Sequence, residues 1–404
     1  MSYVIFDLET TIRNKIGNNK GSSHCKENKI VYIGWKRRTH SANANVEYWG
    51  DQLSCTIATS GWAVDDYNTD ELFVGHNVKF DLLYLLRYDK FRKEVFPKLL
   101  IWDTALVEFI ITGQEHKFPS LDECALKYGG TVKPDKVKEL WNAGVDTDKI
   151  DRDLMEEYLT GDVNNTEKVF LPQFEYCKEN GLLPLVWSQM SALKATTMME
   201  HNGMKIDVKE LREYKYEKVK DLADLQVIAY RILVNHLHRH LGMLNVSAIE
   251  QIVNLDSPQF ISKVLFGGTC EYTMRENIGI YKTGARAGMP KYKNVEYEVL
   301  LPTLVAPRLD WETKKVGIFK VGEEELKELL SRVPGGFSGY TELFIEAILK
   351  VRELSKEVNT YIEGISDLIY EDGCIHGNLQ HTVAITGRLT SSNPNLQNIT
   401  CPKE

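Results

Sequence analysis

Two carboxylates, Asp7 and Glu9, stand two residues apart near the start of the chain. They follow the apolar, partly β-branched run at residues 3–6, which is typical of a buried strand. Side chains two apart on a strand point to the same face, so the two acids would lie side by side. Such a pair suits a solvated strand end, but close carboxylates repel unless a cation or a proton lies between them. A divalent metal is the natural third party.

Two further acids suit the same site. Asp81 follows Asn77 at a predicted strand-to-helix transition, from which its side chain can point back toward the first strand. Taken alone, it would suit the first turn of a helix, where acids complement the helix dipole. Asp162 follows Tyr158 by four residues on a predicted helix, which stacks phenol and carboxylate on one face. Taken alone, that pair would suit packing plus a solvated charge.

Together the four acids predict a metal centre, because converging carboxylates are strongly destabilising without cations. Two Mg²⁺ or Mn²⁺ ions about 3.5–4 Å apart would form the clamp used for in-line cleavage of phosphodiesters. One ion would lower the pKa of the attacking water, and the other would stabilise the leaving 3′ oxygen. Tyr158 would orient that water by hydrogen bonding, a role that suits an unionised phenol. We therefore expect Asp7, Glu9, Asp81, Tyr158 and Asp162 to be catalytic, the four acids as metal ligands.

The elements that must position these residues alternate along the first part of the chain. The pattern predicts strands at residues 3–6, 30–35, 45–49, 72–76 and 100–103, and a loop at 13–29. Helices are expected at 82–87, 105–111, 120–127 and 152–170, the third beginning with a capping box of Ser120 and Glu123. This mixture predicts an α/β domain that ends near residue 185.

The remainder is mainly helical. Helices are expected at residues 188–200, 208–241 and 339–361, and another that Ser257 caps, Pro258 begins and Gly267 ends. Residues 270–320 show little periodicity and are assigned to loops and short strands. Segments 374–379 and 382–385 are predicted to pair as a hairpin.

Composition places the chain among ordinary globular proteins. Its 404 residues suit two or three domains, and 43% are hydrophobic and 26% charged. No apolar run approaches the roughly 20 residues of a membrane span, and no signal peptide is evident. The seven scattered cysteines form no C-x-x-C pair, which favours reduced thiols in an intracellular protein (cytoplasmic, or in the host cytoplasm if viral). The net charge of −8 is not typical of a nucleic-acid-binding protein. It does not exclude one, because nucleic-acid binding depends on a local basic surface rather than on the net charge.

The ordered carboxylate motifs resemble the three exonuclease motifs of the DEDD superfamily, tyrosine subtype. The resemblance covers about residues 1–185 and implies a ribonuclease H-like fold that removes nucleotides from 3′ ends. By the same resemblance, Thr10 and Asn77 would contact the terminal nucleotide. These motifs alone do not decide between DNA and RNA.

Residues 386–399 resemble the motif that opens the palm of family A (DNA polymerase I-like, phage-type) polymerases. Its cation, Arg388, and its amides, Asn395, Gln397 and Asn398, suit sequence-independent hydrogen bonds to sugar-phosphate and minor-groove acceptors. By composition alone the stretch would be a polar loop.

Three other segments are similar to the thumb of the same family. Residues 200–207 resemble the entry to the thumb, and residues 257–266 resemble its next helix. Arg352, Lys356, Thr360 and Tyr361 match the basic thumb helix that grips primer–template phosphates. The first three recur every four residues and would share one face, each phosphate contact steepening the salt dependence of binding.

The sequence also departs from the family pattern. Thr400 stands where the family usually has proline, and the later palm and fingers motifs with the polymerase's own aspartates are absent. We therefore expect an exonuclease domain at 1–185, a thumb-like region at 186–372 and an incomplete palm at 373–404. Such a chain would polymerise DNA only together with the missing part, carried by a second polypeptide if the polymerase is split, or lost if it is truncated.

The leading hypothesis is a metal-dependent 3′→5′ proofreading exonuclease joined to the thumb and palm start of a family A DNA polymerase. Its partners would be a single-stranded 3′ end and a primer–template duplex. One alternative is a free-standing exonuclease of the ribonuclease D type, which would prefer RNA ends. Another is a non-catalytic DNA-binding subunit, which would bind primer–template without cleaving it.

Overall fold

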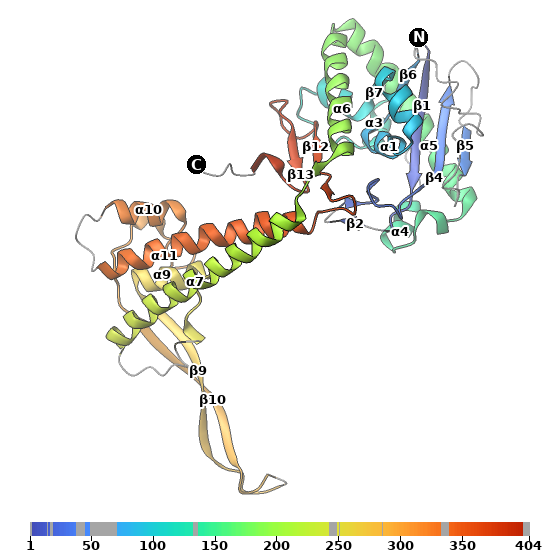
Figure 1. Cartoon of the computed structure of the whole chain (residues 1–404). Coiled ribbons are helices and arrows are strands. Elements are labelled where there is room, and N and C mark those ends of the chain that lie inside the picture. Colours follow the sequence, from blue (N-terminus) through green and yellow to red (C-terminus); the bar gives the residue numbers. More distant parts are fainter. Residues whose placement is uncertain are drawn as a thin grey trace. The chain divides into compact units, whose positions relative to one another are not determined.

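The computed structural model describes residues 2–13, 15–16, 19–37, 45–48, 71–131, 136–241, 249, 251–284, 286–332 and 339–398. The chain forms two compact units, shown in Figure 1. The first unit comprises residues 1–208 and 364–404, and the second comprises residues 209–363. The boundaries expected at 185 and 372 do not coincide with these limits. The division into exonuclease, thumb and palm therefore stays a prediction about function.

A five-stranded mixed sheet forms the centre of the first unit. Its order is β5 (Asn45–Tyr48), β4 (Ile30–Arg37), β1 (Tyr3–Thr10), β6 (Leu72–Gly75) and β7 (Leu100–Asp103). β1 runs antiparallel to β4 and parallel to β6, and β7 is parallel to β6. All five predicted strands are present, and Trp49, the expected end of the third, lies outside the described residues. Because β1 and β6 are parallel neighbours, their carboxyl ends meet at one edge of the sheet.

Six α-helices belong to the described part of the first unit before residue 203. They are α1 (Lys79–Leu85), α2 (Thr104–Ile111), α3 (Leu121–Lys127), α4 (Lys136–Asn142), α5 (Arg152–Glu179) and α6 (Leu183–Asn202). The capping box predicted for α3 is confirmed. Short π-helical and 3₁₀ turns occupy Phe91–Val95, Phe96–Lys98 and Thr147–Lys149. A two-residue hairpin, β2 (Lys15–Ile16) with β3 (Asn19–Lys20), lies in the predicted loop.

α5 continues past its predicted end at residue 170, although it contains Pro172. Tertiary packing extends it: Phe170 and Phe174 both pack on Trp102 of β7, with ring centroids 5.6 and 5.5 Å away. Trp187 of α6 packs on the same indole at 5.7 Å. This cluster keeps α6 with the sheet, which explains why the first unit extends beyond residue 185.

The carboxyl-terminal segment of the first unit pairs differently from the predicted hairpin, which is wrong. β11 (Cys374–Ile375) pairs with β8 (Met204–Lys205), and β12 (Asn378–Gln380) pairs with β13 (Thr390–Ser392). The ammonium of Lys79 donates to Leu379 O at 2.7 Å and to Asn378 Oδ1 at 3.2 Å. These long-range bonds fix residues 378–379 beside α1, so local turn formation does not decide the pairing. The one-turn helix α12 (Gly364–Ser366) opens this segment, and a 3₁₀ turn spans Leu396–Asn398.

The second unit contains the helices α7 (Val208–Leu241), α9 (Pro258–Phe266), α10 (Glu323–Ser331) and α11 (Gly339–Lys356). A π-helical segment, Glu357–Glu363, continues α11, and a 3₁₀ turn spans Leu309–Trp311. Ser257 caps α9 by accepting from Phe260 N, as predicted. The core includes apolar side chains from all four helices, among them Leu233, Phe260, Leu326 and Phe344, and from the base of the strands described next.

The prediction of loops and short strands at residues 270–320 is wrong for residues 270–301 and confirmed for residues 302–320, which are loop apart from a 3₁₀ turn and an isolated bridge. β9 (Gly268–Ile280) and β10 (Pro290–Leu301) form a long antiparallel ribbon within this region. Residues 275–280 and 290–294 are exposed on both faces, so they need no alternation of apolar and polar side chains. The usual signal of a half-buried strand is therefore missing from the sequence.

No helix among the described residues is both long and apolar enough to span a membrane.

Candidate functional site

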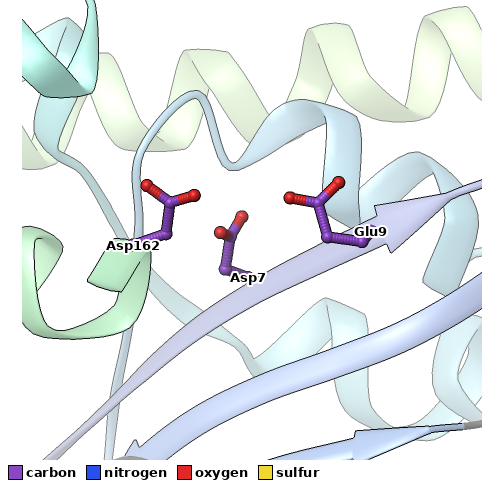
Figure 2. A group of neighbouring side chains, drawn as sticks. All are labelled: Asp7, Glu9 and Asp162. Carbon is purple, nitrogen blue, oxygen red and sulfur yellow. The ribbon is translucent and has the colours of Figure 1, made fainter. Parts of the chain in front are cut away.

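Three of the four predicted acids converge at the sheet edge, as Figure 2 shows. Asp7 and Glu9 project from β1 and Asp162 projects from α5, and one carboxylate oxygen of each lies within 4.8 Å of the others. Asp162 is buried, and the two acids of β1 are half-buried. Oxygen donors at this spacing are the ligands that Mg²⁺ and Mn²⁺ prefer.

Asp81 lies beside the same strand. Its carboxylate accepts a hydrogen bond from Leu8 N at 2.9 Å, and the residue is 2% exposed. Burial raises its pKa well above the ordinary value, and the charges of Asp7 and Glu9 raise it further, while the Leu8 N–H lowers it. The four carboxyl groups therefore favour either a proton on Asp81 or a bound cation.

Gly34 allows α5 to bring Asp162 to this edge. It pairs with Asp7 across β1 and β4, so both positions face α5. A Cβ on Gly34 would lie 2.6 Å from Leu159 Cγ and 2.9 Å from Val163 Cγ2. Leu159 and Val163 are fully buried and flank Asp162 along the helix. The missing side chain thus sets how closely the helix approaches the sheet.

Tyr158 lies one turn before Asp162 on α5, as predicted. Its ring packs edge-on against Trp141 at 5.6 Å with an interplanar angle of 81°, and its side chain is half-buried. The Trp141 indole donates to Thr147 Oγ1 at 3.2 Å, so this aromatic pair is connected to the polar loop described next.

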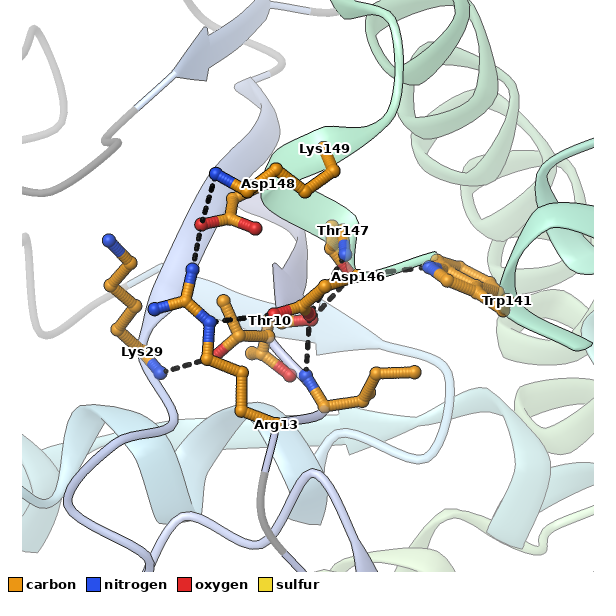
Figure 3. A network of polar contacts seen from close by, with 10 residues as sticks. Thr10, Arg13, Lys29, Trp141, Asp146, Thr147, Asp148 and Lys149 are labelled. Atoms are coloured by element: carbon orange, nitrogen blue, oxygen red, sulfur yellow. Dashed lines mark hydrogen bonds and ion pairs between the residues drawn. The ribbon is translucent and has the colours of Figure 1, made fainter. Parts of the chain in front are cut away.

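A polar network holds the chain that leaves β1 (Figure 3). The Thr147 hydroxyl donates to Thr10 O at 2.7 Å, and Asp146 Oδ1 accepts from Ile12 N at 2.9 Å. Arg13 pairs with Asp146 at 2.7 Å and also with Asp148. The network fixes the end of the strand that carries Glu9 and Thr10. Sequence reasoning missed it, although three consecutive cap-forming residues at 146–148 offered a signal.

Asn77, a predicted nucleotide contact, lies in the turn before α1 with a positive φ of 57°. Its backbone N–H and that of Val78 donate to the buried Asp103 carboxylate at 3.1 and 3.0 Å. The same carboxylate caps α2. Burial raises the pKa of Asp103, and His76 and the N–H groups of Asn77 and of the first turn of α2 oppose that rise. Asn77 also lines a cavity of about 560 Å³, whose other walls include Lys79, Phe80, Ser120, Gln380 and Thr382.

The predicted thumb contacts lie on α11 and its continuation. Arg352 is half-buried and donates to Val321 O, and burial lowers its pKa. Lys356 and Thr360 are exposed. One predicted phosphate ligand therefore also braces its own unit, whereas the other two face solvent.

The predicted palm contacts lie around β13. Arg388 and Asn395 are exposed, and Gln397 is exposed while its amide donates to Leu389 O at 3.0 Å. Asn398 closes the 3₁₀ turn at Leu396–Asn398. Ile399, the last residue of the motif, and Thr400, which stands where the family usually has proline, lie outside the described residues.

Comparison with known proteins identifies DNA polymerases as relatives of this chain. Residues 297–404 match the family model for DNA polymerase family A. The chain is related to the family A DNA polymerases. DNA polymerase I of Synechocystis is 31% identical over 132 residues, which cover 32% of this chain and 13% of that protein. The thermostable DNA polymerase I of Thermus aquaticus is 27% identical over 202 residues, 50% of this chain and 17% of that protein.

A phage relative matches over nearly the whole chain. The DNA polymerase of Bacillus phage SP01 is 22% identical over 433 residues, which cover 98% of this chain and 42% of that protein. The chain thus spans less than half the length of each of these three curated relatives.

A solved structure shares the fold. The polymerase domain of Pol1 from M. smegmatis, in complex with DNA primer-template and dNTP, has a TM-score of 0.60 and 16% identity. The match covers 100% of this chain and 53% of that one. The predicted relation to family A polymerases is confirmed. The family match includes α11 and the Arg388 motif but not the carboxylate cluster near the other end of the chain.

Proposed function

We propose that the chain is the 3′→5′ proofreading exonuclease part of a family A DNA polymerase, together with a primer–template-binding thumb and the start of the palm. The exonuclease would be of the DEDD tyrosine subtype, and the mixed sheet of the first unit would be the central sheet of its ribonuclease H-like fold. The supporting observation is that Asp7, Glu9 and Asp162 converge to within 4.8 Å, with Asp81 bonded to the same strand.

The donor set fits two divalent cations, Mg²⁺ or Mn²⁺. All four side chains offer hard oxygen ligands, and burial together with the charges of Asp7 and Glu9 raises the pKa of Asp81. Asp7, Glu9, Asp81 and Asp162 would hold the ions. When bound, the ions would polarise the scissile phosphodiester and lower the pKa of a water molecule.

The chain's own groups would position the reactants. Tyr158, half-buried one turn from Asp162, would hold a water by hydrogen bonding through its neutral phenol. Thr10, anchored through Thr147, and Asn77, fixed by Asp103, would orient the terminal nucleotide of a single-stranded 3′ end. Hydrolysis adds water across the terminal phosphodiester and releases a nucleoside monophosphate.

The second unit and the palm segment would hold duplex DNA. Exposed Lys356, Thr360, Arg388, Asn395 and Gln397 are polar groups that suit phosphate and sugar contacts without regard to sequence. Arg352 would contribute with the part of its guanidinium that does not bond Val321. The primer-template held by the structural relative supports the same role for this fold.

The test is Mg²⁺-dependent release of nucleoside monophosphates from labelled single-stranded DNA. We expect Asp7→Ala with Glu9→Ala to abolish release, whereas Glu175→Ala with Glu179→Ala, a matched loss of two exposed acids, leaves it unchanged. Mg²⁺ should raise the melting temperature of the wild type and of the control but not that of the Asp7/Glu9 variant. Retained cleavage in that variant would defeat the assignment, and faster cleavage of RNA than of DNA ends would defeat the proofreading role.

A further inference from the structure

The ribbon formed by β9 and β10 projects from the helices of the second unit (Figure 1). Each strand has about a dozen residues, so the ribbon extends about 40 Å. Beyond Met274 and Val295 every described residue of both strands is exposed. An isolated two-stranded ribbon is marginally stable by itself and here buries no core in its outer half. Its length is therefore not explained by the packing of the unit.

The charges of the ribbon are segregated along its length. Residues 277–295, which we call the basic tip, contain Lys282, Arg286, Lys291 and Lys293 but no aspartate or glutamate. No ion pair involves these four cations in the part of the chain that the structure describes. Three acids of the ribbon, Glu271, Glu296 and Glu298, lie nearer its base, and Glu276 lies opposite Lys293 at the inner limit of the tip. The other three cations of the tip have no acid opposite them on the ribbon, although the whole chain is acidic.

The basic tip has a defined shape. Tyr281 N donates to Met289 O at 3.0 Å and Gly288 N donates to Tyr281 O at 2.8 Å, which extends the ladder into the turn. The ammonium of Lys291 lies 5.9 Å from the centroid of the Tyr281 ring, and the guanidinium of Arg275 lies 4.6 Å from that of Tyr292. Such contacts restrict long side chains without neutralising them. The cations are therefore presented on a fixed hairpin.

We propose that the basic tip is a contact for duplex DNA, which binds the phosphate backbone without regard to sequence. A polyanion complements the tip, and a two-stranded ribbon is narrow enough to enter a major groove. The acids near the base would confine the contact to the distal end. The proposal rests on the proposed function in one respect, namely that the chain acts on DNA. It adds a surface distinct from the thumb and palm residues, and all of the basic tip precedes residue 297, where the family match begins.

The test is the salt dependence of binding to a fluorescently labelled duplex with a recessed 3′ end, followed by anisotropy in EDTA so that no cleavage occurs. Neutralising Lys282, Arg286 and Lys291 with glutamine should reduce the slope of log K against log salt by about 2.7, because each phosphate contact contributes about 0.9. Between 50 and 200 mM salt, the wild type should then lose about 40-fold more affinity than this variant.

Two controls isolate the tip. The charge-preserving variant K282R/R286K/K291R should keep the wild-type slope, and glutamine at Lys93, Lys98 and Lys178, three exposed lysines of the first unit, should also keep it. The three tip side chains pack on no core, so the melting temperature should not change.

An unchanged slope in the glutamine variant would overturn the proposal, as would a wild type that does not bind the duplex at 50 mM salt. A tip that instead captures an acidic protein segment would also give an unchanged slope. Exonuclease release from short single strands is measured separately. It should be the same in the tip variants and the wild type, so failure of the proposed catalytic site and failure of the tip are distinguishable.

Discussion

Replacing Gly34 with alanine should disrupt the proposed metal centre without changing any of its proposed ligands. The added Cβ would lie 2.6 Å from Leu159 Cγ and 2.9 Å from Val163 Cγ2, whereas carbon atoms pack at about 3.5–4.0 Å. The methyl group meets α5 at the turn that carries Asp162, and both neighbours are fully buried. The helix must therefore withdraw from the sheet by roughly 1 Å, and Asp162 must move away from Asp7 with it.

The size of the effect follows from that displacement. Overpacking of this kind costs about 1–3 kcal/mol of stability, and a displacement of about 1 Å in an active site can cost about 100-fold in rate. We expect Gly34→Ala to lower the free energy of unfolding, measured with urea, by about 1–3 kcal/mol. It should also weaken Mn²⁺ binding measured by calorimetry and slow nucleotide release about 100-fold at saturating metal.

Two further variants separate this mechanism from a general loss of stability. Leu159→Ala on the Gly34→Ala background removes the closest clashing atoms but leaves Val163 Cγ2 at 2.9 Å, so metal affinity should recover in part although the cavity costs stability. Gly339→Ala is the matched control, since a Cβ there meets nothing within 4 Å and its φ is not positive. Wild-type Mn²⁺ affinity and release rate in a folded Gly34→Ala protein would refute the role assigned to Gly34.

Three other substitutions test neighbouring parts of the argument. Tyr158→Phe should slow nucleotide release by about 100-fold while leaving Mn²⁺ affinity unchanged, because in the proposed mechanism the phenol orients water and binds no ion; weaker ion binding would contradict this role. Thr147→Val removes the bond to Thr10 O and should raise KM for single-stranded DNA about tenfold, worth about 1.4 kcal/mol, with a smaller change in kcat; an unchanged KM would refute it. Burial lowers the pKa of His24 from 6.5 to about 3. The free energy of unfolding of the protein should therefore decrease as the pH is lowered from 6.5, by up to about 1.4 kcal/mol per pH unit. His24→Gln should lose less free energy of unfolding between pH 7 and 5 than the wild type, and equal losses would contradict the assignment.

The parts of the site that are local in sequence could be predicted from it. Asp7 and Glu9 share a face because alternation along a strand is fixed by backbone geometry. Tyr158 and Asp162 lie one turn apart because helical spacing is equally fixed. The capping box of α3 and the proline start of α9 are likewise local chemistry, and both are present as predicted.

The parts that depend on distant contacts could not be predicted in the same way. Gly34 is an isolated glycine in a strand, a pattern that signals close approach of another segment but does not name that segment. The length of α5 depends on Trp102, and the pairing of residues 378–380 depends on Lys79, far away in the chain. Each of these features is decided by which surfaces meet, and no short window of sequence contains both surfaces.

Net charge illustrates the same limit. The value of −8 adds the charges of all residues, wherever the fold places them. The carboxylates at the sheet edge and the lysines of the basic tip therefore enter the same sum, although they belong to different surfaces. The carboxylates are buried or half-buried and repel a phosphate unless cations intervene, whereas Lys282, Arg286 and Lys291 are exposed and have no acid opposite them on the ribbon. In the proposed function both surfaces would bind the same polyanion, one through bound metal and the other directly. Chelation should remove the first interaction and high salt the second, so that the two are separable on one DNA molecule.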